Sequence, residues 1–265
     1  MVQVQDVCAF LEQFAPGKLA ETWDNVGLLL GRSDTPVQRI MTCLTLTQAV
    51  AAEAVRSGVQ LIVTHHPILF RGTKRLTDRT AEGRIVLTLM ESGVAVFSPH
   101  TCYDSAGQGI NQQLAERLGL QSIAPIRANS DLPGLGAGRW GVLETAEPAS
   151  EFLGKVMEVT GATFLQATLA GPDRIQRVAI ACGAASEFLD DAVRCGCDTF
   201  VTGEARFHSI LEAQAAGMNL ILTGHYPSER PAVEELAEIL GERFPGITCF
   251  ASEEDRDPVT VYVAS

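Results

Sequence analysis

From residue 40 onward, short apolar runs alternate with segments of helical periodicity, and this alternation limits the folds open to the chain. Strands separated by helical segments are typical of βαβ units and of sheets that are mostly parallel. The predicted strands are Ile40–Leu46, Leu61–Thr64, Val94–Ser98, Val178–Cys182, Thr199–Thr202 and Leu220–Thr223. The predicted helices are Val4–Phe14, Thr47–Ser57, Glu82–Ser92, Gly109–Leu118, Ala185–Cys195, Ser209–Ala216 and Ser228–Glu242.

The two halves of the chain resemble each other. Residues 54–64 and 192–202 are identical at six of eleven positions, and both pass from a helical pattern through a glycine to an apolar run. We therefore predict an α/β protein of two related lobes, with mostly parallel sheets, that face each other across a crevice. The first lobe is expected at 1–123, with a contribution from the C-terminal segment, and the second at 141–265. Residues 124–140, rich in Pro, Gly, Asn and Ser, are predicted to form a loop or hinge.

Composition narrows the class of protein. A net charge of −12 repels a phosphate backbone, which disfavours nucleic-acid binding. No apolar run approaches the roughly 18 residues that span a bilayer, and the N-terminal residues lack the basic region of a signal peptide. The seven cysteines form no CxxC pair, so neither a disulfide framework nor a structural zinc site is indicated. We expect a cytoplasmic protein without a membrane partner.

All five histidines follow predicted strands directly or lie just inside the next helix. The ligand-type side chains in these places are His65, His66, His100, Asp104, Glu204, His208, His225 and Glu229. In open α/β sheets, ligands bind beyond the carboxyl ends of the strands. Imidazole combined with carboxylate suits Zn, Fe, Mn, Ni or Co, so the pattern predicts a metal site.

Adjacent histidines at a strand end point in different directions, so His65 and His66 can each hold one of two neighbouring metals. Two metals about 3.5–4 Å apart need a bridging carboxylate, and Asp104 and Glu229 are available. Glu204 and His208 can serve as partners of the metal ligands or as proton-transfer groups. The alternative for both is ordinary chemistry at the start of a helix, where a carboxylate is favourable in any case.

Five motifs occur in a fixed order along the chain. They are Thr22-Trp23-Asp24-Asn25-Val26-Gly27-Leu28, Val63-Thr64-His65-His66-Pro67, His100-Thr101-Cys102-Tyr103-Asp104, Thr202-Gly203-Glu204 and Gly224-His225-Tyr226-Pro227-Ser228-Glu229. From about residue 3 to residue 263 the chain resembles the Nif-three-like dinuclear-metal family, also called GTP cyclohydrolase I type 2 homologues. The resemblance implies a two-lobed α/β subunit, a ring-shaped homohexamer and two divalent metal ions between the lobes. Carried over by motif position, the metal ligands are His65, His66, Asp104, His225 and Glu229.

These features favour a metal-dependent hydrolase that activates water at a dinuclear centre. Its substrate would be a small molecule, a nucleotide or another phosphorylated compound, and the family name would make the reaction GTP ring opening. The catalytic candidates are Glu204 and His208. The alternative is a non-catalytic metal-binding assembly that acts in metal handling or protein interaction.

Two further features have competing interpretations. The segment Phe70–Arg84 contains the cations Arg71, Lys74, Arg75, Arg79 and Arg84. It is either a phosphate-recognition loop or a solvated loop whose charges pair with Asp78 and Glu82. The Trp23-Asp24-Asn25 segment is expected to be a structural turn braced by a buried indole.

Overall fold

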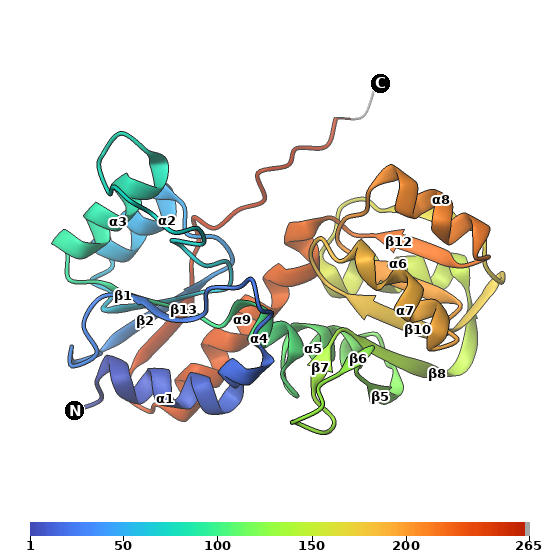
Figure 1. Cartoon of the computed structure of the whole chain (residues 1–265), viewed down its shortest axis with the longest axis horizontal. Coiled ribbons are helices and arrows are strands. Elements are labelled where there is room, and N and C mark those ends of the chain that lie inside the picture. Colours follow the sequence, from blue (N-terminus) through green and yellow to red (C-terminus); the bar gives the residue numbers. More distant parts are fainter. Residues whose placement is uncertain (263–265) are drawn as a thin grey trace. The chain divides into compact units, whose positions relative to one another are not determined.

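The computed structural model describes residues 1–262, which form two compact units (Figure 1). Unit 1 comprises residues 1–10, 25–99 and the chain from 233 onward, and unit 2 comprises residues 11–24 and 100–232. The chain therefore enters each unit more than once, and the boundaries fall within helix α1 (Val4–Phe14) and within helix α9 (His225–Arg243). Residues 263–265 of the predicted second lobe lie outside the described residues.

These boundaries differ from the predicted lobes at 1–123 and 141–265. The C-terminal segment, which was expected to contribute to the first lobe, lies in unit 1, where strand β13 (Thr248–Ala251) pairs in parallel with β2 (Arg39–Cys43). By contrast, residues 11–24 and 100–123 of that expected lobe belong to unit 2. Residues 124–140, predicted as a loop or hinge, include the short hairpin of β6 (Arg127–Ala128) and β7 (Gly136–Ala137) and belong to unit 2 throughout. Glycine- and proline-rich sequence is compatible with short hairpin strands as well as with a linker, so composition alone does not separate the two.

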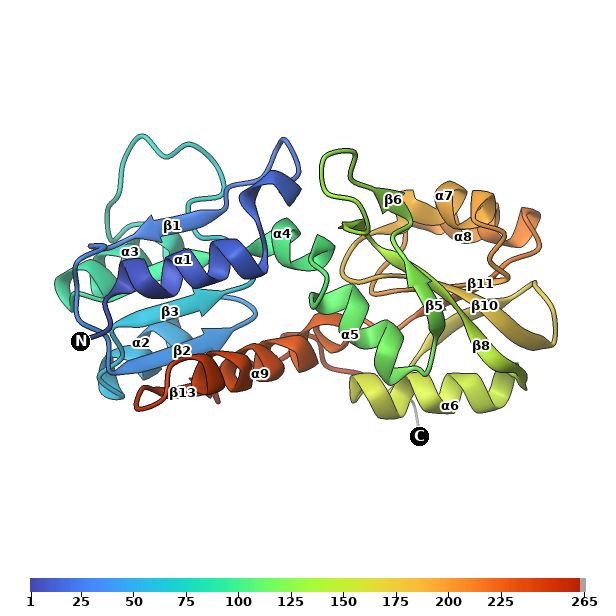
Figure 2. The same ribbon diagram turned by 90° about the horizontal axis from the view of Figure 1, so that it is seen from below.

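Unit 1 is built on a five-stranded sheet in the order β1-β4-β3-β2-β13. Strand β1 is antiparallel to β4, and the other pairings are parallel, as predicted. Its remaining elements are β1 (Gly27–Leu30), α2 (Gln48–Arg56), β3 (Leu61–Thr64), α3 (Ala81–Glu91) and β4 (Ala95–Ser98). Helices α2 and α3 cover one face of the sheet, and α1 and the C-terminal part of α9 cover the other (Figure 2).

Unit 2 contains a six-stranded sheet in the order β5-β8-β10-β11-β12-β9. Its helices are η1 (Gly17–Leu19), α4 (His100–Ser105), α5 (Ile110–Arg117), α6 (Ala149–Thr160), η2 (Ser186–Phe188), α7 (Leu189–Arg194) and α8 (Phe207–Ala215). Its larger strands are β5 (Gln121–Ala124), β8 (Arg139–Pro148), β9 (Gln166–Leu169), β10 (Arg174–Ala181), β11 (Thr199–Thr202) and β12 (Asn219–Leu222).

The α/β class is confirmed, but the sheet of unit 2 is mixed where a mostly parallel sheet was predicted. Strands β10, β11 and β12 are parallel to one another, whereas β5, β8 and β9 run antiparallel to their neighbours. The antiparallel strands lie in segments without a continuous apolar run, because all three have exposed or half-buried positions. Strands β5 and β9 form the two edges of the sheet, and β8 lies next to β5. Polar strands of this kind lack the pattern by which buried parallel strands are recognised.

Alternation along the central strands of unit 2 divides their side chains between two cores. Val178 and Ile180 pack with Phe152 of α6 on one face, while Ala179 and Ala181 pack toward α7 and α8 on the other. Both faces of β10 are therefore buried, which explains its nearly continuous apolar sequence. None of the helices within residues 1–262 is long and apolar enough to cross a membrane.

The internal sequence repeat corresponds to a repeated turn. After α2 and α7 the chain turns at Gly58 and Gly196, which have φ angles of 64° and 71°. In each turn the glycine N–H donates to the carbonyl three residues earlier, at 3.2 and 2.9 Å. Glycine adopts this left-handed conformation without steric cost, so the next strand can begin at once. The two turns lead into β3 and β11, whose ends carry candidate site residues.

A buried carboxylate on α2 fixes the segment after β13. Glu53 accepts hydrogen bonds from the Ser252 hydroxyl, from the Glu253 N–H at 2.9 Å and from the Glu254 N–H at 3.3 Å. We predict that Glu53→Ala lowers the free energy of unfolding by about 2–4 kcal/mol, because hydrogen bonds to a charged group contribute roughly 1.5–3 kcal/mol each. Urea unfolding would measure this change in the free energy of unfolding, with Glu91→Ala, at an exposed position, as the control. An equal, small effect of both variants would contradict this role.

Candidate metal centre

The histidine pair of unit 1 directly extends strand β3. The backbone N–H of His65 donates to Cys43 O and that of His66 to Leu44 O, both at 2.9 Å, so the parallel ladder with β2 continues through the pair. His65 is 3% exposed. The Ser98 hydroxyl donates to the His65 carbonyl at 2.7 Å, which fixes this peptide from the neighbouring strand β4.

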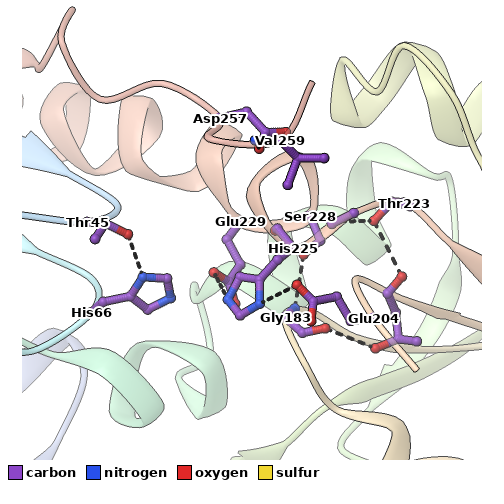
Figure 3. Close-up of polar contacts among 12 residues, drawn as sticks. Thr45, His66, Gly183, Glu204, Thr223, His225, Ser228, Glu229, Asp257 and Val259 are labelled. Carbon is purple, nitrogen blue, oxygen red and sulfur yellow. Dashed lines mark hydrogen bonds and ion pairs between the residues drawn. The ribbon is translucent and has the colours of Figure 1, made fainter. Parts of the chain in front are cut away.

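The two rings lie close together, although neighbouring residues on a strand were expected to point in different directions. Their centroids are 5.1 Å apart and their planes make an angle of 52°. Thr45 Oγ1 lies 2.7 Å from His66 Nδ1 (Figure 3), so a metal would be bound through the other ring nitrogen, Nε2. A hydrogen bond to one nitrogen fixes the ring orientation and the tautomer of a ligating imidazole.

In unit 2, His225 lies between two glutamates at the start of α9 (Figure 3). Its Nδ1 is 3.2 Å from Glu204 Oε1, and its Nε2 is 3.2 Å from Glu229 Oε2, one helical turn later. Glu204 is 57% exposed and Glu229 only 5%. The hydrogen bond to Glu229 raises the pKa of His225 to about 9, against the opposing effect of burial. Glu204 thus orients the imidazole, and Glu229 shares the position that a metal would take.

Asp104, on the short helix α4, is buried and lies within the electrostatic influence of Glu229. Burial raises the pKa of Asp104 to about 8, and the negative charge of Glu229 adds to the effect. The Asp104 carbonyl accepts a hydrogen bond from Asn111 Nδ2 at 3.0 Å, and Asn111 Oδ1 accepts from the Cys182 N–H at 2.8 Å. Asn111, which sequence reasoning missed, therefore ties α4 to the end of strand β10.

Two glycines let the first turn of α9 approach the ends of β10 and β11. At Gly183, with φ of 70°, a Cβ would clash with Glu229 Oε1. At Gly203, a Cβ would lie 3.0 Å from His225 Cα and 2.9 Å from Ser228 Oγ. The Gly183 N–H donates to Ser228 Oγ at 2.9 Å, which holds the two segments together. A glycine directly after a buried strand was the sequence signal for both positions.

Asp24 holds the start of α4. Its Oδ1 is 2.7 Å from His100 Nδ1, and its Oδ2 accepts from the Thr101 N–H at 3.2 Å. His100 has a φ of 29°, which is uncommon for a residue with a side chain. The prediction of a buried indole at Trp23 is wrong, because Trp23 is 58% exposed and lies edge-on to His100. The turn is braced by the Asp24 carboxylate instead.

A cavity of about 580 Å³ opens beside Glu204, within unit 2. Its charged lining residues are Glu187, Asp190, Glu204, Arg206 and Glu212, so its field is predominantly negative. His208 lies exposed in the first turn of α8, with its ring centroid 6.2 Å from that of Phe207. The structure thus gives Glu204 a place beside a candidate ligand, whereas the proton-transfer role of His208 stays a prediction.

The donor set of unit 2 fits a divalent cation. Asp104 and Glu229 bring two carboxylates into one partly desolvated region, and His225 adds an imidazole. Placing carboxylates together away from water is unfavourable unless a positive charge compensates them. Carboxylate and imidazole are the ligand types that Zn, Fe, Mn, Ni and Co accept.

Without metal, this region should make stability depend on pH. The folded-state pKa of Asp104 is about 8 and that of His225 about 9, above the unfolded values of roughly 3.9 and 6.5. Because the folded chain then binds more protons than the unfolded chain, stability falls as pH rises from about 5 to 9. We expect the urea midpoint of chelator-treated protein to decrease over this range. Asp104→Asn should flatten the profile, and a profile unchanged by Asp104→Asn would contradict the assignment.

Comparison with known proteins places the chain in a family. A GTP cyclohydrolase 1 type 2 homolog of Clostridium perfringens is 30% identical over 97% of this chain and 98% of the relative. The GTP cyclohydrolase 1 type 2 of Helicobacter pylori is 30% identical over 91% of this chain and 92% of that relative. The crystal structure of Staphylococcus aureus protein SA1388 superposes with a TM-score of 0.88 at 25% identity, over 98% of this chain and 99% of that one. Residues 2–258 match the family described as Duf34/NIF3 (NGG1p interacting factor 3), and the chain belongs to this family, as its motifs predicted.

Proposed function

We propose that the protein is a metal-dependent hydrolase with two divalent ions per subunit. The proposed ligands are His65, His66, Asp104, His225 and Glu229. The observation that carries the proposal is the sequence of contacts from Glu204 through His225 to the buried Glu229 in unit 2, at 3.2 Å on each side of the ring. A carboxylate on one imidazole nitrogen and a ligand position on the other is the usual arrangement of histidines at catalytic metals.

The side chains of the site have distinct roles in this proposal. Divalent ions, when bound, supply Lewis-acid chemistry that activates water and polarises the substrate. Glu204 holds the proton of His225 on Nδ1, which leaves Nε2 as the ligand atom. Since the Glu204 carboxylate is 57% exposed and lines the 580 Å³ cavity, it can also exchange a proton with a substrate there. His208 is the second candidate for proton transfer.

The names of the relatives support a small-molecule substrate. The Clostridium perfringens and Helicobacter pylori proteins are named for GTP cyclohydrolase, a nucleotide-opening activity. Family membership by itself does not determine the reaction, because one fold can host several chemistries. We therefore propose a nucleotide or another phosphorylated compound as the substrate class.

We also propose that the subunits assemble into a ring-shaped homohexamer, as the family resemblance implies. Phe207 and Leu211 support an association surface, because they lie one turn apart on α8 and are 69% and 44% exposed. Light scattering during size-exclusion chromatography would give the mass. A monomeric mass at micromolar concentration would contradict this proposal.

Substitution of single ligands tests the dinuclear centre. We expect two divalent ions per subunit in protein purified without chelator, and loss of both in Glu229→Ala, because two adjacent dications repel strongly without a bridging carboxylate. His65→Ala should lose mainly one of the two ions. Elemental analysis gives the count, circular dichroism checks the fold, and Glu238→Ala on the exposed side of α9 is the matched control. A single ion in metal excess would rule out the dinuclear centre, and two tightly held ions in Glu229→Ala would rule out the bridge.

A substrate screen tests the hydrolase itself. Metal-loaded protein is assayed for turnover of nucleotides, phosphoesters and cyclic amides, with Glu204→Gln as the variant that keeps the metal ligands. We expect metal-dependent turnover that Glu204→Gln reduces at least tenfold. Full metal occupancy with no turnover in any class, together with rapid release of metal to a chelator, would instead support a non-catalytic role in metal handling.

A further inference from the structure

The loop between β3 and α3 carries charges that the proposed metal centre does not use. It arches away from the sheet of unit 1 (Figure 2). Its base is fixed on both sides. The Leu69 N–H donates to Glu82 Oε1 at 2.9 Å, and Arg84 Nη1 donates to the Asp78 carbonyl at 2.9 Å. Asn25 Nδ2 donates to the Leu69 carbonyl, also at 2.9 Å. The loop is therefore anchored at the points where it leaves and rejoins the core.

The end of the loop packs closely on the first turn of α3. A Cβ at Gly83 would clash with the Thr77 carbonyl, so a glycine is required beneath this part of the loop. Thr80 caps the helix, because its Oγ1 accepts from the Gly83 N–H at 3.0 Å. These contacts fix both ends of the loop, which limits the conformational freedom that residues 71–79 lose when a ligand binds them.

Four cations extend from this anchored loop. Arg71, Lys74, Arg75 and Arg79 are all exposed, and none of them makes an ion pair with any residue in 1–262. The sequence left open whether they pair with Asp78 and Glu82. Glu82 instead accepts the Leu69 N–H at the base of the loop. The four cations are therefore exposed to solvent, and the ion pairs of residues 1–262 include none between them and Asp78 or Glu82.

The charge of the loop is opposite to that of the rest of the chain. Residues 71–79 hold four cations and one acid, a net charge of +3, and since the whole chain carries −12, the remainder carries −15. A nucleic acid or an anionic membrane would extend past the loop and meet this negative field. A small anion that contacts the loop alone would not.

We infer that residues 71–79 bind a small ligand carrying at least two phosphoryl groups. One phosphoryl group bears about −1.5 to −2 charges at pH 7, so four cations match two or three such groups better than one. Three of the four are arginines, whose planar guanidinium binds phosphate oxygens in pairs. Phe70 and Leu76, 42% and 40% exposed, offer apolar contact to the organic part of the ligand.

The cavity of unit 2 has the opposite charge from the loop. Four carboxylates and one arginine line the cavity beside Glu204, so it repels phosphate. Binding of phosphate by the loop itself does not depend on metal or on catalysis.

Calorimetry on the full-length protein tests the inference, with inorganic triphosphate and orthophosphate as probes and chelator present throughout. We expect triphosphate to bind at least tenfold more tightly than orthophosphate. Its affinity should fall as the salt concentration increases. The variant with Arg71, Lys74, Arg75 and Arg79 all changed to Gln should bind triphosphate at least tenfold more weakly. The matched control changes Arg32, Arg56, Arg194 and Arg256 to Gln, which removes the same charge from other exposed positions.

The outcomes separate this inference from the proposed function. Equal loss in both variants would show an effect of net charge and overturn the loop assignment, and equal affinity for the two probes would overturn the requirement for several phosphoryl groups. Tighter binding of duplex DNA or of phosphatidylserine vesicles than of triphosphate would replace the small ligand by a macromolecule. His66→Ala should leave triphosphate binding unchanged even if it removes metal. The absence of hydrolase activity in the substrate screen would therefore not contradict phosphate binding by residues 71–79.

Discussion

Two carboxylates held together in a partly desolvated region are the constraint around which unit 2 is organised. Burial raises the pKa of Asp104 to about 8, and repulsion by Glu229 adds to the effect. Such a pair is unfavourable unless positive charge compensates it, so the chain must hold it in place by other contacts. Asp24 fixes the start of α4, and Asn111 fixes the backbone at Asp104 itself. A bound cation would compensate the unfavourable free energy of holding these two carboxylates together.

The regular part of this fold could be predicted because its signals are local. Helix Val4–Phe14 and strands Leu61–Thr64 and Thr199–Thr202 have the predicted bounds, since each shows clear apolar periodicity and a defined end. Strands β8 and β9 were missed because their exposed positions interrupt that pattern. The mixed sheet of unit 2 depends on long-range pairing, which periodicity does not encode.

The site was predictable as a set of ligand types but not as a set of contacts. The order of polar residues after the strands pointed to His225 and Glu229, and the structure brings these two together on one turn of α9. That Asp24 rather than a buried Trp23 braces the turn could not be read from the sequence, because both residues suit a turn. Glu204 was predicted as a partner of the metal ligands or as a proton-transfer group, but only the structure shows which candidate ligand it contacts, His225 at 3.2 Å.

The internal repeat explains why the two units present their candidate ligands differently. If residues 54–64 correspond to 192–202, then His65 corresponds to Gly203 and His66 to Glu204. At the end of β3, both positions carry imidazoles. At the end of β11, Gly203 leaves room for the backbone of α9, because a Cβ there would lie only 3.0 Å from His225 Cα. Glu204 then orients the His225 ring. The same helix–glycine–strand unit thus carries two candidate ligands itself in the first case. In the second case it provides the space and the orienting carboxylate for a candidate ligand, His225, that comes from the next helix.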